Sequence, residues 1–222
     1  KVNNLKFGRE YFIPKPVDPR LIAEVSAAVA KAAIDSGVAR RSIEDWDEYK
    51  NSLSVMLGLK TKLTQKIYST ASAHPQRVVF AEATHPTMLR AAVQAKAEGL
   101  CMPILLGSEE RIRKIATGLD LPLDGVEIVD PRHDNEAERR NRYAEILTEK
   151  LQRDGYTFEE ANDKMYEHNY FGMMMVETEE ADAFITGLYT KYSNTTKVAR
   201  DVIGIRPGLG SFGTMHIINS SK

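Results

Sequence analysis

The sequence predicts an α/β fold with a mostly parallel sheet, preceded by a helical connector. Residues 77–107 have the pattern of a strand, a helix and a second strand, and strands joined through a helix lie parallel in one sheet. Strand-like and helical patterns keep alternating from residue 108 onward, whereas residues 1–75 are predominantly helical. In a parallel sheet, ligands bind beyond the carboxyl ends of the strands.

The first part of the chain is predicted to be helical. Asp18-Pro19 is a good helix start, because aspartate caps a helix and proline fits its first turn. Gly37 is expected to end this helix. Two further helices are expected, one from about residue 43 and one over residues 59–71. The apolar stripe of residues 19–36 consists mostly of small side chains, and it needs a partner surface.

The central unit supplies the first candidate ligand loops. Residues 77–81 and 102–106 are continuous apolar runs, as expected of strands that are buried on both faces. Residues 87–98 between them show helical spacing and stop at a glycine. The loops that follow the two strands, residues 82–86 and 107–109, are therefore the first places to look for ligand contacts.

The remaining elements continue the alternation. Ser108 is expected to cap a helix, and Thr157 with Glu160 has the spacing of a capping box. Methionines at helical spacing favour a buried packing segment. The other expected elements are strands at 126–129, 183–187 and 215–218, and helices at 108–117, 136–153, from 157, and 195–202, with the apolar segment at 169–177.

Composition excludes several classes of function. The 31 acidic and 30 basic residues nearly cancel, so no net field attracts nucleic acid or an anionic membrane. The single cysteine, Cys101, excludes internal disulfides and cysteine-rich zinc sites, and we expect it to be a small core residue. The five histidines are scattered, so no metal site is predicted. Apolar runs are short, and we expect a cytoplasmic protein without a membrane span or signal peptide.

The loop from Gly187 to Lys197 is the best candidate for binding an anion. It follows a predicted strand, begins with a permissive glycine and leads into a helix, and it carries several hydroxyl groups and two lysines. That combination suits phosphate at a helix N-terminus. Polar loops are common, so an ordinary connection is the alternative. The candidate binding residues are Gly187, Thr190, Lys191, Ser193 and Lys197.

Two other patterns favour ordinary turns. The segment Gly208–Gly213 has the spacing Gly-x-Gly-x-x-Gly, but the dinucleotide fingerprint requires a strand before it and a helix after it. Here the order is reversed. Asp130, His133 and Asp134 cluster after the third strand, where such residues commonly form turns.

Two groups of motifs resemble parts of known enzymes. The segments that resemble the closing part of a bacterial NADP-dependent malic enzyme are 7–21, 28–33 and 36–39. The segments that resemble the start of a phosphate acetyltransferase domain are 78–82, 103–107, 170–177 and 181–187. This order resembles the large hybrid malic enzymes, and the resemblance covers essentially the whole chain.

The resemblance implies a domain arrangement. Residues 1–58 would be the helical C-terminal tail of the malic enzyme domain and a connector. Residues 59–222 would form an incomplete phosphate acetyltransferase-like domain, with a three-layer α/β/α structure. The phosphotransacetylase fold has two such domains with the acyl-CoA cleft between them. The rest of that fold, with its catalytic serine and aspartate, is expected after Lys222, so no catalytic residue is expected in this chain.

The resemblance also implies ligands and partners. NADP and a divalent metal, Mg or Mn, would bind in the malic enzyme domain upstream of Lys1. Acetyl-CoA is the effector that the resemblance suggests, and the partners would be further copies of the same polypeptide and the upstream domain. Neither nucleic acid nor membrane is expected as a partner.

Three positions depart from the phosphotransacetylase pattern. Where that pattern has arginines, this sequence has Leu151, Lys197 and Thr87. A lysine keeps the charge but lacks the bidentate fork of arginine, and a leucine keeps neither. One electrostatic contact to a developing charge contributes about 2.7–4 kcal/mol to catalysis. The departures favour a regulatory, oligomerising domain of a malic enzyme. The alternatives are an active phosphate acetyltransferase, which makes acetyl phosphate from acetyl-CoA, and a purely structural assembly domain.

Overall fold

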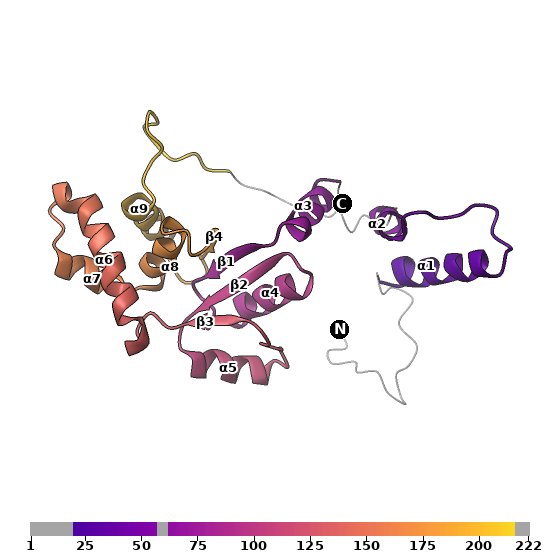
Figure 1. Ribbon diagram of the computed structural model, residues 1–222, viewed down its shortest axis with the longest axis horizontal. Helices are drawn as coiled ribbons and strands as arrows, with labels where there is room; N and C mark the ends of the chain where they lie inside the picture. Colours follow the sequence, from indigo (N-terminus) through magenta and orange to yellow (C-terminus); the bar gives the residue numbers. More distant parts are fainter. Residues whose placement is uncertain (1–19, 57–61, 216–222) are drawn as a thin grey trace. The chain divides into compact units, whose positions relative to one another are not determined.

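The computed structural model describes residues 20–56 and 62–215 (Figure 1). The chain forms two compact units, which divide between Ser69 and Thr70. The predicted domain boundary between residues 58 and 59 lies outside the described residues and stays a prediction. No helix in the described part of the chain is long and apolar enough to cross a membrane.

The N-terminal unit contains two helices that pack against each other, α1 (Arg20–Asp35) and α2 (Trp46–Met56). Ala27 of α1 is buried, and Lys50 pairs with Glu24 at 2.9 Å. Gly37 takes a positive φ of 71° after α1, which confirms the predicted helix end. The predicted start at Asp18-Pro19 lies outside the described residues.

Helix α2 begins later than predicted. The carboxylate of Asp45 accepts hydrogen bonds from the N–H groups of Asp47 and Glu48, each at 2.9 Å, so the helix starts at Trp46 and not near residue 43. A third helix, α3 (Lys62–Ala73), corresponds to the helix predicted at 59–71. The described part of residues 20–75 is therefore helical, as predicted.

The second unit is built on a four-stranded sheet within the described residues. The strands are β1 (Gln76–Phe80), β2 (Cys101–Leu106), β3 (Glu127–Val129) and β4 (Ala183–Ile185). Their order is β3-β2-β1-β4, and every neighbouring pair is parallel. The chain moves outward from β1 through β2 to β3 and then returns to the other side of β1, so the direction of winding reverses between β1 and β4.

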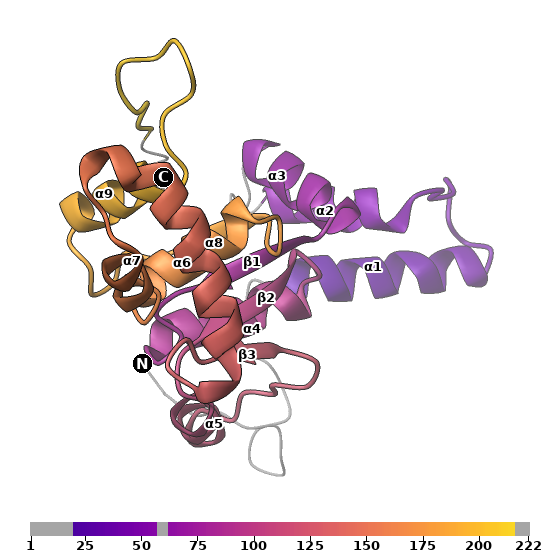
Figure 2. The ribbon, with the colours of Figure 1, turned by 60° about the vertical axis from the view of Figure 1, so that its left-hand side comes forward.

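Helices cover both faces of this sheet (Figures 1 and 2). Phe80 and Leu105 pack with α4 (Pro86–Ala97) and α5 (Glu109–Gly118). Val79 and Leu106 point to the opposite face. The helices on that face are α6 (Ala137–Leu151), α7 (Phe158–Lys164), α8 (His168–Glu177) and α9 (Tyr192–Val202). The predicted three-layer α/β/α arrangement with a parallel sheet is confirmed.

The packing of α8 on the sheet depends on Gly172. A Cβ atom at this position would lie 2.5 Å from Cε2 of Phe184 and 2.9 Å from Cδ1 of Leu106. Both contacts are shorter than van der Waals separation. Only a glycine therefore lets the helix approach β4 and β2 this closely. The methionines of α8, Met173–Met175, are buried in the same core, as their spacing predicted.

Several local expectations are confirmed and others need correction. Thr157 and Glu160 form the predicted capping box. Ser108 occupies the N-cap of α5 but makes no side-chain cap hydrogen bond. Phe158, the first residue of α7, is 42% exposed. Cys101 is half-buried at the start of β2, where burial raises the pKa of its thiol.

Three other boundaries differ from the predictions. The strand predicted at 183–187 ends at Ile185, and the helix predicted at 195–202 begins at Tyr192. The helix predicted at 136–153 is α6 flanked by two 3₁₀ turns, Asp134–Glu136 and Gln152–Asp154. Residues 208–213 form a turn, bends and irregular backbone without helix or strand, in agreement with the turn interpretation of the Gly-x-Gly-x-x-Gly segment. Most of the strand predicted at 215–218 lies outside the described residues.

Candidate functional site

A cavity of about 440 Å³ lies at the carboxyl edge of the sheet. Its walls come from the segments that follow all four strands and from the start of α8. Glu82 and Thr84 follow β1, and Ser108 follows β2, so both loops named from the sequence contribute to it. Asp130 follows β3. A concave site at this edge is where parallel α/β sheets bind small molecules.

Glu82 organises one wall of the cavity. Its Oε2 accepts hydrogen bonds from the backbone N–H groups of Gly187 (3.1 Å) and Leu188 (2.6 Å). Its Oε1 accepts hydrogen bonds from the backbone N–H groups of Tyr189 (2.8 Å) and Thr190 (3.2 Å). The side chain is only 7% exposed. One carboxylate therefore holds the whole turn after β4 against the end of β1.

The charge of Glu82 is stabilised where it lies. Burial alone would raise the pKa of this carboxyl group, but the hydrogen bonds from the four N–H groups outweigh burial and the pKa is lowered. Glu82 is therefore an anion at neutral pH. It occupies the amides of residues 187–190, which begin the loop of residues 187–197 that the sequence suggested for an external anion. These contacts lie at the point where the winding of the sheet reverses.

His168 forms the floor of the cavity at the start of α8. Its Nδ1 lies 2.9 Å from the carbonyl oxygen of Ala81. The Nδ1–H therefore donates to this carbonyl, which leaves Nε2 without a proton in the neutral ring. Burial lowers the pKa of His168, and the charge of Arg132 acts in the same direction, so the imidazole is neutral at pH 7. The neighbouring Asn169 accepts a hydrogen bond from Thr186 at 3.0 Å.

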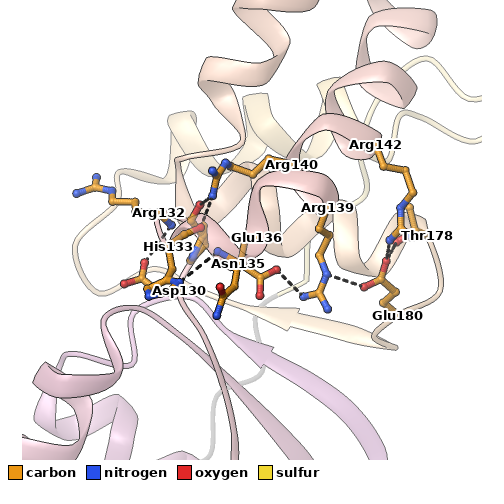
Figure 3. A network of polar contacts seen from close by, with 11 residues as sticks. Asp130, Arg132, His133, Asn135, Glu136, Arg139, Arg140, Arg142, Thr178 and Glu180 are labelled. Atoms are coloured by element: carbon orange, nitrogen blue, oxygen red, sulfur yellow. Dashed lines mark hydrogen bonds and ion pairs between the residues drawn. The ribbon is translucent and has the colours of Figure 1, made fainter.

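The loop after β3 is held in place by Arg140 (Figure 3). This arginine is only 4% exposed. Its Nη1 donates to the carbonyl oxygens of Pro131 and His133, each at 2.7 Å, and its guanidinium group lies 4.4 Å from the ring centroid of Tyr166. The loop that carries Arg132 is therefore fixed by a buried cation.

The acidic and histidine cluster in this loop makes the turns that were predicted. The carboxylate of Asp130 accepts a hydrogen bond from the N–H of Arg132 at 3.0 Å. Nδ1 of His133 accepts one from the N–H of Asn135 at 3.2 Å. Asp130 also lines the cavity, a second role that the sequence did not reveal.

A separate ion-pair network ties α6 to the turn before β4 (Figure 3). Arg139 lies between Glu136 (3.2 Å) and Glu180 (3.4 Å), and Arg142 also pairs with Glu180. These side chains line a separate, open pocket of about 1020 Å³ and not the cavity. The network therefore connects the elements around the site without contributing to it.

The sequence-predicted site residues fall in different places. Gly187 donates to Glu82, and Thr190 lines the cavity. Lys191 is the N-cap of α9, and Ser193 and Lys197 are exposed on that helix. None of these last three residues lines the cavity, so their role in binding stays a prediction.

Two positions that depart from the transferase pattern also have defined surroundings. Leu151 ends α6 and packs against the core of the helical layer. Thr87 lies in the first turn of α4, where its N–H donates to Nδ1 of His85 at 3.1 Å. Neither of these two side chains lines the cavity.

Arg111, Arg132 and His168 line the cavity, although the sequence did not identify them as site residues. Arg111 lies on α5 in a run of charged residues and has the pattern of an ordinary solvent-exposed side chain. Arg132 follows a strand directly, and its position after a predicted parallel strand was the available signal. Nothing in the sequence around His168 indicated a binding site.

A sequence profile of the family described as "Phosphate acetyl/butaryl transferase" matches residues 62–222. The chain belongs to the phosphate acetyl/butaryl transferase family. A phosphotransacetylase of this kind from Streptococcus pyogenes has a similar structure, with a TM-score of 0.60 and 27% identity over 67% of this chain and 44% of that chain. The family membership agrees with the α/β/α unit described above.

Two curated relatives differ in how much of the chain they cover. The NADP-dependent malic enzyme of Salmonella typhimurium is 39% identical over 97% of this chain, which spans 28% of that enzyme. The phosphate acetyltransferase of Thermoanaerobacterium thermosaccharolyticum is 30% identical over 71% of this chain and 47% of that protein. The chain therefore spans less than a third of the malic enzyme and about half of the acetyltransferase, and the resemblance to both is confirmed.

Proposed function

We propose that this chain is part of an NADP-dependent malic enzyme, which decarboxylates malate oxidatively to pyruvate. In this proposal the transferase-like region is an acetyl-CoA-responsive domain that also mediates association between copies of the enzyme. The observation that carries the proposal is the share of this chain that each relative matches. The malic enzyme matches 97% of the chain, whereas the acetyltransferase matches 71%. The match to the malic enzyme therefore includes helical residues that the family profile, which starts at residue 62, leaves out.

The geometry of the site supports a binding role over transfer chemistry. The backbone amides of residues 187–190 already hold the carboxylate of Glu82, so these amides do not receive a transferred phosphate. Lys191, Ser193 and Lys197 lie outside the cavity lining. A cavity at the switch point of the sheet is suited to binding a small molecule such as part of an acyl-CoA.

NADP and the divalent metal do not fit the residues that the structure describes. The part of the chain that the structure describes has no group of three His, Cys, Asp or Glu side chains that could hold a metal ion. The Gly-x-Gly-x-x-Gly segment is not preceded by a strand and followed by a helix in residues 203–215. We therefore place both cofactors in the part of the parent enzyme that corresponds to the malic enzyme domain.

The second candidate function is an active phosphate acetyltransferase. Membership in the transferase family favours it. In that case the reacting groups would be completed by residues other than those described here, and acetyl-CoA and phosphate would give acetyl phosphate and CoA.

Two parallel assays of the complete parent polypeptide test the proposal. One measures malate-dependent NADPH formation with and without acetyl-CoA, and the other measures acetyl phosphate formation. A change in malate oxidation without acetyl phosphate formation supports the regulatory role. Acetyl phosphate formation with unchanged malate oxidation supports the second candidate. No effect in either assay leaves an assembly role, which size measurements of the intact protein and of a truncated protein would test.

A further inference from the structure

Two histidines at the carboxyl edge of the sheet cap the elements that follow them. The backbone N–H of Thr87 donates to Nδ1 of His85 at 3.1 Å, where His85 is the N-cap of α4. The backbone N–H of Asn135 donates to Nδ1 of His133 at 3.2 Å, at the start of the 3₁₀ turn that leads into α6 (Figure 3). A backbone N–H can only donate, so Nδ1 is unprotonated in both rings. Both caps therefore require a neutral imidazole with its proton on Nε2.

A proton at Nδ1 removes such a cap. The charged imidazole carries an N–H group at both ring nitrogens, so Nδ1 then faces the backbone N–H as a second donor. Its positive charge also lies at a helix N-terminus, where the helix dipole disfavours it. Histidine side chains change charge between about pH 5 and 8. A histidine cap is therefore complete at the upper end of this range and is lost as the pH falls through it.

The surroundings of His85 do little to offset a positive charge. The first turn of α4 contains no acidic residue, and the next charged residue of the helix is Arg90. The carboxylate of Glu82, in the same loop, is already held by four backbone N–H groups. From the turn after β4, the ring of Tyr189 packs edge-on against the imidazole, with 5.2 Å between the ring centroids. Protonation of His85 should therefore disturb the start of α4 and its contact with this turn.

The surroundings of His133 are more balanced. Arg140 of α6 donates to the carbonyl oxygen of His133, a contact that does not involve the imidazole. The other charged residues in this loop and in the 3₁₀ turn are Asp130, Arg132, Asp134 and Glu136. Three carboxylates offset part of the charge of an imidazolium group, whereas two guanidinium groups oppose it. We therefore expect a smaller response to pH at His133 than at His85.

The two caps hold segments that form walls of the cavity. Thr84 directly precedes His85, Arg132 directly precedes His133, and both line the cavity. Tyr189, the ring partner of His85, lines it as well. Loss of the caps would therefore act on the loop after β1, on the loop after β3 and on the turn after β4.

His168, on the floor of the cavity, does not depend on its charge in the same way. Its Nδ1–H donates to the carbonyl oxygen of Ala81 at 2.9 Å, and this hydrogen bond persists when Nε2 also carries a proton. Burial lowers the pKa of His168, so its ring becomes charged only at a lower pH than an exposed histidine. The response in the range of an ordinary histidine therefore belongs to the two capping residues.

We propose that His85 and His133 form a pH-sensitive device that loosens the walls of the cavity as the pH falls from about 8 to about 5. At the upper end of this range both caps hold the loop before α4 and the loop after β3 in place. At the lower end the caps are lost, and both loops open more often. The device goes beyond the proposed function, because it does not depend on which ligand occupies the cavity.

Hydrogen exchange of the complete parent polypeptide at about pH 7.5 and about pH 5.5 tests the device across the histidine range. Each rate is expressed relative to the intrinsic rate of the same amide at the same pH, which gives a protection factor. We expect the protection of peptides that cover residues 84–90 to fall by about 2- to 30-fold at the lower pH, the range that corresponds to loss of one N-cap. Peptides that cover residues 131–137 should lose protection in the same direction but by a smaller factor.

Asparagine and alanine variants separate the cap from its charge. His85→Asn keeps a capping acceptor that does not titrate, so the protection of residues 84–90 should be the same at both pH values. His85→Ala lacks the acceptor, so the protection should be low at both. His133→Asn and His133→Ala should do the same for residues 131–137. The asparagine variants retain the cap, and they keep the test decisive if an alanine variant folds poorly.

His74→Asn is the matched control. His74 is exposed before β1 and does not line the cavity, so its replacement should leave the pH response of both sets of peptides unchanged. The proposal is overturned if the unmodified protein shows equal protection at both pH values, or if the asparagine variants lose as much protection at the lower pH as the unmodified protein. It is also overturned if His74→Asn abolishes the response. Exchange reports no activity, so failure of the regulatory role in the malate assay would leave this result unaffected.

Discussion

The amide nitrogen of Tyr189 lies 2.8 Å from Oε1 of Glu82. This contact is one of four by which a single buried carboxylate joins the end of β1 to the turn after β4. The two segments meet where the winding of the sheet reverses, which is where α/β proteins place their ligands. Glu82 therefore fixes one wall of the cavity.

Replacement of Glu82 should loosen this wall. In Glu82→Gln the amide side chain keeps one acceptor oxygen and loses the negative charge, so at least two N–H donors lose their acceptor. We expect a loss of about 3 kcal/mol in local stability, since hydrogen bonds to charged groups contribute about 1.5–3 kcal/mol each. Hydrogen exchange of peptides that cover residues 187–190 would measure it. Glu159→Gln, an exposed position on α7, should leave this exchange unchanged; an equal change in both variants would contradict the assignment.

The stabilisation that Glu82 provides should decrease at acidic pH. Because its pKa in the folded protein is lower than its ordinary value of 4.5, its stabilising contribution is complete above about pH 4.5 and is lost as the pH falls through the lowered pKa. The difference in stability between the unmodified protein and Glu82→Gln should therefore be constant from pH 6 to 8 and shrink on further acidification. Chemical unfolding at a series of pH values measures it. A difference that grows as the pH falls would show the opposite shift.

A methyl group at position 172 should disrupt the contact between α8 and the sheet. In Gly172→Ala the new Cβ would lie 2.5 Å from Phe184, and overpacking of this kind costs about 1–3 kcal/mol. Thermal unfolding should show a lower midpoint. Gly118→Ala is the matched control, because nothing lies within 4 Å of a Cβ there and the residue is helical. That change should raise stability by about 0.5–1 kcal/mol, so equal destabilisation by both changes would argue against close packing at Gly172.

Replacement of Arg140 should make the loop after β3 less ordered. Arg140→Met leaves the carbonyl groups of Pro131 and His133 without their buried donor, and we expect a loss of about 2–3 kcal/mol. Faster hydrogen exchange in residues 130–135 would report it. Arg153→Met, at an exposed position after α6, serves as the control. Unchanged exchange in Arg140→Met would show that the loop holds its shape without this clamp.

The elements of the sheet could be predicted because their signals are local. Continuous apolar runs marked β1 and β2, and the capping box at Thr157 is contained in four residues. The predicted helix boundary was wrong where the residue at the N-cap is not a typical capping residue. The helix α9 starts after Lys191, whose side chain makes no cap hydrogen bond, and lysine is not a capping residue type.

The candidate site could be predicted only in part. The loops at the carboxyl ends of the strands follow from the parallel topology. The hydrogen bond from Gly187 to Glu82 does not follow from the topology, because Glu82 lies 105 residues away in the chain and no spacing rule connects the two. For the same reason the turn after β4 was interpreted as open to an external anion, although its amides hold an internal one. Arg111 and Arg132 resemble exposed charges until the fold brings both of them to one cavity.

The most direct test of the regulatory role is a titration of acetyl-CoA into the complete parent polypeptide, performed with and without malate. Allosteric coupling is reciprocal, so an effector that alters malate affinity must have its own affinity altered by malate to the same extent. We predict dissociation constants that differ by about 5- to 150-fold between the two titrations, which corresponds to a coupling of about 1–3 kcal/mol. Equal dissociation constants, with acetyl phosphate formed when inorganic phosphate is added, would contradict the account and identify the domain as a working transferase.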